Sequence, residues 1–165
     1  MKYTGGVLVW LALSVLGAAA AEKLLRRVKA LEYVLSLLRK IEFEIRRFSR
    51  PFPQLAKILA AQEKEPGLAA ECVRFLNEGE SFPTAWQKGT QSSSLPFKKE
   101  ERKILSTLGK ELSSCDREGC FQVIGVYSER FSLSLDEAKN ARAKYSKLCL
   151  FSGVFIGGMV FITMI

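Results

Sequence analysis

The two ends of the chain are each free of charged residues over 18 consecutive positions, and this feature constrains the fold more than any other. The two stretches are residues 4–21 and 148–165. About 17 to 25 apolar residues in a helix are enough to cross the hydrocarbon core of a bilayer. We therefore predict a transmembrane helix at each end, with residues 22–147 between them forming one domain outside the bilayer.

Lysine and arginine residues adjoin the inner flank of each apolar stretch. A cleaved signal peptide is the alternative for the first stretch, because the alanines at 18–21 resemble a cleavage site. A signal peptide carries its positive charge ahead of the apolar run, however, and here only Lys2 and the terminal amine precede it. Cytoplasmic segments are enriched in basic residues, so we predict an uncleaved anchor, a cytoplasmic central domain and both termini on the far side. The basic residues expected at the membrane surface are Lys23, Arg26, Arg27, Lys29, Lys139, Arg142, Lys144 and Lys147.

The second apolar stretch also contains a pair of small residues at helical spacing. Gly153 and Gly157 form a G-x-x-x-G pattern, which lets two helices approach closely in lipid. The pattern predicts packing of the transmembrane helices and leaves open whether they pair within one molecule or between copies in a homo-oligomer.

The central region shows helical periodicity throughout. Apolar residues recur at steps of three and four from Leu24 to Phe48, with no glycine or proline after Gly17 to separate this helix from the first apolar stretch. Further helices are expected at about 53–62, 66–76 and 98–113, a short one after Ser81 followed by a polar loop at 89–94, and a last one from 117 into the second apolar stretch. The predicted fold is all-α: a small antiparallel bundle of about six helices, clasped between two long helices that continue into the N- and C-terminal transmembrane spans.

Two residues have expected structural roles in this bundle. Trp86 lies near Phe82 and Ala85 at helical spacing, which is typical of a packed core. Asp116 precedes the last helix and is well placed to cap its N-terminus.

The residue types argue against an enzyme. The chain has no histidine, the side chain that most often acts as a general base near neutral pH, and no phosphate-binding loop or nucleophile motif. Its four cysteines contain no C-x-x-C pair, and one of them falls in an apolar stretch, so neither a zinc site nor a redox function is indicated. We predict no catalytic residue, no metal site and no cofactor.

Positive charge gathers a second time at the far end of the bundle. Arg46, Arg47 and Arg50 crowd the end of the first long helix, and Arg117 begins the last one, which lies at the same end if the two are antiparallel. Cations are favoured at a helix C-terminus by the helix dipole, so a solvated helix end is one interpretation. The other is a docking face for an acidic cytoplasmic partner, about 40 Å from the membrane at 1.5 Å per residue. The net charge of +8 is otherwise explained by the membrane flanks, and no nucleic-acid partner is expected.

The N-terminal apolar stretch and five further segments occur in an order that is more specific than any of them alone. The five further segments are EFEIRRFSRPFPQL at 42–55, SFPTAW at 81–86, EERKILSTLGKEL at 100–112, CDRE at 115–118 and LFSGVFIGGMVFITMI at 150–165. Together they resemble the stage III sporulation protein AB family of endospore-forming bacteria over essentially the whole chain. The sequence departs from the family pattern at Ser113, where a glycine is usual, and at Cys120, where a glutamine is usual.

The resemblance implies a component of the channel-like secretion apparatus that the mother cell builds at the engulfed forespore. It implies a location in the outer forespore membrane and a role similar to the inner-membrane platform of type II secretion and type IV pilus machines. The implied partners are a companion secretion-type ATPase and other membrane components of the channel. A helical module that binds anionic lipid without an ATPase partner is the main alternative; a secreted bundle and a pore of paired spans are others.

Overall fold

The computed structural model is built of six α-helices, and the residues that it describes contain no strand. The backbone is described for residues 2–48, 51–63 and 67–164, and the side chains for 21–145 within those ranges. The all-α class predicted from the sequence is confirmed. The helices are α1 (Lys2–Phe48), α2 (Phe52–Ala61), α3 (Leu68–Asn77), α4 (Phe82–Ser92), α5 (Lys99–Ser114) and α6 (Arg117–Met164).

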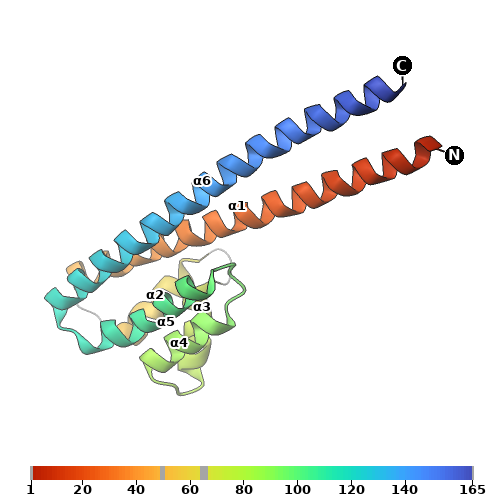
Figure 1. The fold of residues 1–165 in the computed structure, drawn as a ribbon. Coiled ribbons are helices and arrows are strands. Elements are labelled where there is room, and N and C mark those ends of the chain that lie inside the picture. The colour runs from red at the N-terminus through yellow and green to blue at the C-terminus, as the bar shows by residue number, and fades with distance from the viewer. Residues whose placement is uncertain (1, 49–50, 64–66, 165) are drawn as a thin grey trace.

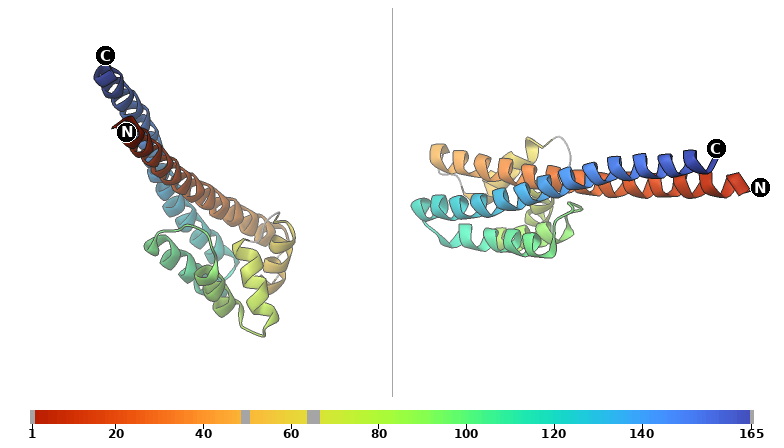
Figure 2. Two further views of the ribbon diagram at one scale, coloured as in Figure 1. Left: turned by 90° about the vertical axis from the view of Figure 1, so that its right-hand side faces the viewer. Right: turned by 45° about the horizontal axis from the view of Figure 1, so that its top comes forward.

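The two long helices, α1 and α6, form an antiparallel hairpin with both chain termini at one end (Figure 1). They lie side by side in every view (Figure 2). The apolar stripe of α1 explains this, since fully buried residues recur at three- and four-residue steps on both helices. The hairpin residues that are at most 1% exposed include Leu31, Val34, Leu38 and Ile41 on α1 and Ile124, Phe131 and Ala138 on α6.

The four short helices cover one side of this hairpin, at the end away from the termini (Figure 1). Leu59 of α2, Leu68 of α3 and Leu105 of α5 belong to the same buried cluster as the hairpin residues, so the core is continuous. The arrangement differs from the sequence prediction in one respect. The long helices pack directly on each other instead of holding the short helices between them, because both carry a stripe of buried apolar residues along the described part of the hairpin.

Helix α4 is longer than the sequence predicted. Residues 89–92 were expected in a loop, but they complete this helix. Gly89 allows close approach to α3, since a Cβ there would lie 3.0 Å from the backbone nitrogen of Cys72. Thr90 is fully buried and its hydroxyl donates a hydrogen bond of 2.8 Å to the carbonyl oxygen of Trp86. The loop prediction was wrong there because burial and this bond outweigh the weak helix propensity of glycine and threonine.

Helix α5 crosses α4 at Gly109, and this close approach yields a prediction. A Cβ at Gly109 would lie 2.6 Å from the ring of Trp86, whereas nothing lies within 4 Å of a Cβ at Gly125 on α6. Glycine to alanine inside a helix ordinarily stabilises by up to about 1 kcal/mol. We expect that gain for Gly125→Ala, but a loss of about 1–3 kcal/mol for Gly109→Ala because the packed core is overfilled. Urea unfolding of the full chain in detergent, followed by circular dichroism, measures the change in the free energy of unfolding for both variants. A change of the same sign in both would contradict the close packing of Gly109 against Trp86.

The predicted spans at 4–21 and 148–165 fall almost entirely on residues whose side chains lie outside the described set, and so do Gly153 and Gly157. In the part of the chain where side chains are described, no helix offers a segment long and apolar enough to traverse a bilayer. The two spans therefore stay predictions.

Candidate docking face

The last turn of α1 and the first turn of α6 meet at the end of the hairpin away from the termini. The guanidinium of Arg117 donates a hydrogen bond to the carbonyl oxygen of Arg46, 71 residues earlier in the chain. The last carbonyl groups of a helix lack partners within the helix, so this bond satisfies one of them. The structure thus brings together Arg46 and Arg117 as the sequence predicted, while Arg50 lies outside the described residues.

Arg46 has contacts on both long helices. Its guanidinium forms an ion pair of 2.9 Å with Glu42 and lies 5.0 Å from the ring centroid of Phe121 on α6. A guanidinium over an aromatic face is attracted by the ring quadrupole. Arg46 therefore joins the two helices, and its charge is partly balanced within the protein.

Arg47 is placed differently. Its guanidinium lies 5.8 Å from the ring centroid of Phe43 and 5.4 Å from that of Phe48, and its described contacts are with these rings. The two phenylalanines are 53% and 45% exposed, which is unusual for such large apolar side chains. Phe43 was missed by the sequence analysis, although it lies outside the three-and-four spacing and so signals an outward position. We call Phe43, Arg46, Arg47, Phe48 and Arg117 the docking face.

Acidic residues border the docking face on the side of α6. Asp116 accepts a hydrogen bond of 2.9 Å from the backbone nitrogen of Gly119, which places it as the cap of α6. Glu118 is exposed one residue after Arg117. The cationic docking face therefore has a border of opposite charge, and Arg47 is its arginine in contact with two exposed aromatic rings.

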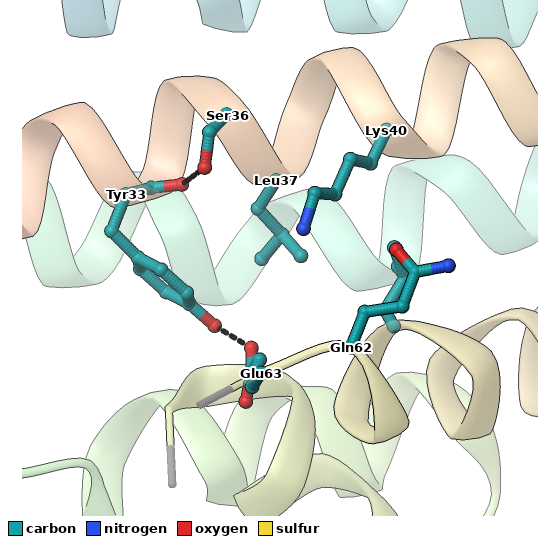
Figure 3. A pocket seen from close by; sticks show the side chains of 7 residues that line it. Tyr33, Ser36, Leu37, Lys40, Gln62 and Glu63 are labelled. Atoms are coloured by element: carbon teal, nitrogen blue, oxygen red, sulfur yellow. Dashed lines mark hydrogen bonds between the residues drawn. The ribbon is translucent and has the colours of Figure 1, made fainter. Parts of the chain in front are cut away.

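A groove between α1 and α2 reaches Phe43 of this face, and Figure 3 shows the part of it that is farther from Phe43. It consists of two adjoining hollows of about 420 and 250 Å³ that share Lys40, Leu59 and Gln62. The first hollow reaches Tyr33, and the second is lined by Phe43 of the docking face.

A hydrogen-bonded pair closes the far end of the groove. The hydroxyl of Tyr33 donates to one carboxylate oxygen of Glu63, as Figure 3 shows, and the other oxygen accepts from the backbone nitrogen atoms of Gly67, at 3.0 Å, and Ala70, at 3.3 Å. Burial, together with the negative charge of Glu63, raises the pKa of Tyr33 well above its usual value. The phenol therefore stays protonated and serves to hold the start of α3 against α1.

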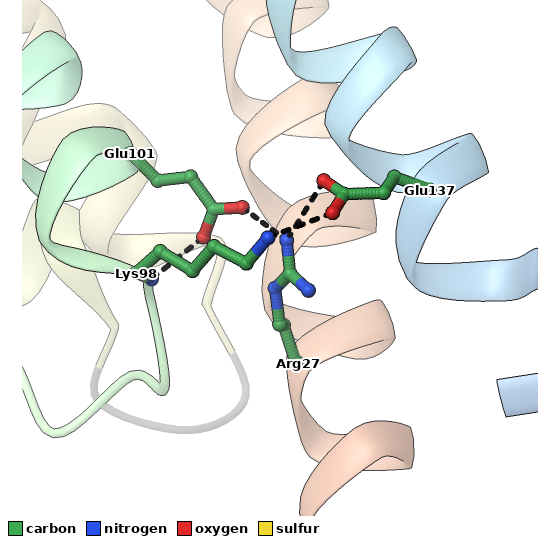
Figure 4. Close-up of polar contacts among 4 residues, drawn as sticks. All are labelled: Arg27, Lys98, Glu101 and Glu137. Carbon is green, nitrogen blue, oxygen red and sulfur yellow. Dashed lines mark hydrogen bonds and ion pairs between the residues drawn. The ribbon is translucent and has the colours of Figure 1, made fainter. Parts of the chain in front are cut away.

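At the opposite end of the short helices, a charged cluster connects α1, α5 and α6 (Figure 4). Arg27 pairs with Glu101 at 2.6 Å and with Glu137 at 3.6 Å, and Lys98 pairs with Glu137 at 2.8 Å. Glu101 also accepts a hydrogen bond of 2.7 Å from the backbone nitrogen of Lys98, which caps the start of α5. The hydrogen bond and charge of Lys98 hold the pKa of Glu137 below its ordinary value.

This cluster corrects the prediction for Arg27. Only 12% of its side chain and 6% of that of Glu101 are exposed. Arg27 was expected at the membrane surface, but its side chain faces the first turn of α5 and not solvent. Its charge is therefore neutralised inside the protein by Glu101. The other basic residues near the ends differ: Lys23, Arg26, Lys29, Lys139, Arg142 and Lys144 are all exposed. The side chain of Lys147 lies outside the described set.

Two of these exposed cations are paired on the surface. Arg26 lies 2.6 Å from Glu22, and Lys139 lies 3.2 Å from Glu32. Exposed ion pairs of this kind contribute little to stability. Lys23, Lys29, Arg142 and Lys144 have no carboxylate partner among the described residues, so their charge is available at the surface.

The described residues offer no group of three or more histidine, cysteine, aspartate or glutamate side chains that could hold a metal ion. Cys72, Cys115 and Cys120 are free thiols. Burial raises the pKa of Cys72 to about 12, so that this thiol behaves as a small apolar core residue.

Together, these features define a class of all-α protein: an antiparallel hairpin of two long helices, four short helices on one side, and an aromatic and basic face at the end opposite the termini. The chain belongs to the stage III sporulation protein AB family, whose model matches residues 2–165. The family resemblance noted in the sequence is thereby confirmed.

One solved structure, a stage III sporulation protein AB, is similar with a TM-score of 0.62 and 24% sequence identity. The alignment covers 72% of this chain and 98% of that one. At this identity the likeness shows that the two chains share a fold. No curated protein matches the sequence.

Proposed function

We propose that the protein is a non-enzymatic platform in the membrane-bound channel of a sporulating cell, and that its docking face binds a companion secretion-type ATPase. Membership of a sporulation family supports the first part. The observation that carries the second part is the joint exposure of Phe43, Arg47 and Phe48 in the last turns of α1. This end of α1 lies at the end of the hairpin farthest from the chain termini (Figure 2).

The chemistry of this face is that of a protein interface. Aromatic residues and arginine are enriched at interfaces, where they account for most of the large losses found on alanine substitution. With the apolar ends of the chain in a bilayer, about 40 Å of α1 would separate the docking face from the membrane, at 1.5 Å per residue from 22 to 48. That distance leaves room for a cytoplasmic ATPase to approach the face.

The face is also held rigid, as a platform requires. Arg117 bonds to the end of α1, and Arg46 lies over Phe121 of α6, so the two helix ends are fixed to each other. A surface that is already ordered loses less conformational entropy on binding than a mobile one.

Arg47→Glu is expected to weaken ATPase binding by about 30-fold or more, the effect of losing one strongly contributing arginine. Arg47→Lys should give an intermediate loss, because lysine keeps the charge but not the planar group that lies over the two rings. Binding of the purified ATPase to the full chain in lipid nanodiscs provides the measurement.

Lys103→Glu is the matched control, since Lys103 is an exposed cation on α5 outside the docking face. It makes the same change in net charge and should leave binding nearly unchanged. The circular dichroism spectrum shows whether the Arg47→Glu variant is folded. If a folded variant binds the ATPase with an affinity within about threefold of that of the unsubstituted protein, the docking face is not the ATPase-binding site.

A module that binds anionic lipid is the second candidate function. The exposed cations near the predicted spans, among them Lys23, Lys29 and Arg142, favour it, because basic residues next to a membrane are attracted to anionic headgroups. This function requires no ATPase, so an absence of binding by the unsubstituted protein would favour it over the platform.

A further inference from the structure

Two of the free cysteines lie together at the turn between α5 and α6. Cys115 follows the last residue of α5, and Cys120 lies in the first turns of α6. Their Sγ atoms are 3.0 Å apart. The sulfur atoms of a disulfide are about 2.05 Å apart, so a small rotation of the two side chains is enough to bring them to bonding distance.

The surrounding structure fixes the thiols in this arrangement. Both Sγ atoms point to the carbonyl oxygen of Leu112, at 3.6 Å from Cys115 and 3.7 Å from Cys120. A Cβ at Gly119 would lie 3.1 Å from the Cβ of Cys115, so the glycine leaves the space that the Cys115 side chain occupies. Because Asp116 is the one residue between Cys115 and the start of α6, the backbone has little freedom to separate the pair.

The two thiols differ in their access to solvent. Cys120 is 3% exposed, and burial together with the neighbouring Cys115 and Asp116 raises its pKa. Cys115 is only half-buried. A soluble oxidant therefore reaches Cys115 first, and the neighbouring Cys120 is a buried, protonated thiol.

We propose that Cys115 and Cys120 are a modification site that closes to an intrachain disulfide when the protein meets a hydroperoxide. The Cys115 thiolate attacks the peroxide oxygen, the O–O bond breaks, and the leaving alkoxide or hydroxide takes a proton to give an alcohol or water. Cys115 is then a sulfenic acid. The sulfur of Cys120 attacks the sulfur of Cys115, the S–O bond breaks, and the proton of Cys120 leaves with the hydroxide as water. Two thiols and one peroxide thus give one disulfide, one water and one alcohol, or a second water from hydrogen peroxide.

This inference is independent of the proposed platform function, because it concerns only the chemistry of the turn. The spacing of five residues did not indicate a redox function in the sequence, since it matches no C-x-x-C pattern. Disulfides inside cells are usually transient and redox-sensing, which is the behaviour that an accessible thiol next to a buried one favours. The site adjoins the docking face, because Arg117 of that face lies between the two cysteines in sequence, and Phe121, whose ring contacts Arg46, follows Cys120 directly.

Treatment of the reduced full chain with hydrogen peroxide, followed by alkylation and peptide mass mapping, tests the proposal. The expected product has lost two hydrogen atoms, no longer alkylates at Cys115 or Cys120, still alkylates at Cys72, and recovers both sites with dithiothreitol. In Cys120→Ser, the reaction is expected to stop at the Cys115 sulfenic acid, which dimedone captures. Cys72→Ser should form the same disulfide as the unsubstituted protein.

Three results would overturn the proposal. One is full alkylation of Cys115 and Cys120 after peroxide treatment that oxidises free glutathione. Another is a disulfide between two chains in place of one within the chain. The third is an absence of dimedone adduct at Cys115 in the folded Cys120→Ser variant, since Cys115 would then not be the residue that meets the oxidant.

Discussion

Replacing Trp86 by alanine is expected to lower the free energy of unfolding by about 3–5 kcal/mol, the usual range for deleting a large aromatic side chain from a core. Trp86 is 2% exposed, its ring lies 5.9 Å from that of Phe82, and Gly109 packs closely against it. Its indole nitrogen donates a hydrogen bond of 2.8 Å to the carbonyl oxygen of Leu105. Trp86 thus holds α4 and α5 together by shape and by a polar bond.

Urea unfolding of the full chain, followed by circular dichroism at helical wavelengths, gives the loss. Trp86→Phe is the control that separates the two contributions, because it keeps an aromatic ring in the core and removes the hydrogen-bond donor with only a small part of the side-chain volume. We expect it to cost about 1–2 kcal/mol, which is the bond together with a small cavity. A loss of less than about 1 kcal/mol for Trp86→Ala would show that the ring is not part of the core that the structure describes.

Glu101→Ala is expected to cost about 3–5 kcal/mol, because it leaves the positive charge of Arg27 buried with only the exposed Glu137, 3.6 Å away, as a partner. The substitution also removes the acceptor for the backbone nitrogen of Lys98 at the start of α5. Replacing both members of the pair by apolar residues, Arg27→Met with Glu101→Leu, should be much less harmful than Glu101→Ala alone, since no unpaired charge then stays buried.

Glu137→Gln is the matched control for this cluster. Glu137 also pairs with Arg27, but its side chain is 62% exposed, so water replaces the lost interaction and little change in stability is expected. The same urea titration compares the three variants. Equal losses of stability for Glu101→Ala and Glu137→Gln would contradict the conclusion that the buried carboxylate of Glu101 is the main partner of Arg27.

The features that the sequence predicted well are those that repeat locally. The apolar steps along α1 and α6 and the prolines at 51 and 53 were enough to predict two long helices and the end of the first. A charge, by contrast, is visible in the sequence while its partner is not. Arg27 looked like its exposed neighbour Arg26, and only the folded chain brings Glu101, 74 residues away, into contact with it.

At the candidate docking face, too, the sequence shows the charged residues but not their partners. The arginines were predicted to lie at one end because antiparallel helices bring the end of one to the start of the other. Arg46 joins the two long helices, whereas Arg47 lies beside exposed aromatic rings. This difference depends on side-chain packing, which no local sequence pattern predicts. The closeness of Cys115 and Cys120 depends on how α5 turns into α6, which spacing alone does not fix.

Neither long helix is interrupted between the docking face and the chain termini (Figure 1). A helix without a sharp kink bends only gently, so the two long helices are expected to behave as stiff rods. Because Arg117 and Arg46 fix the two helix ends to each other, a displacement of the docking face would be transmitted along both helices to the opposite end. Movement at the docking face is therefore expected to move both chain ends with it.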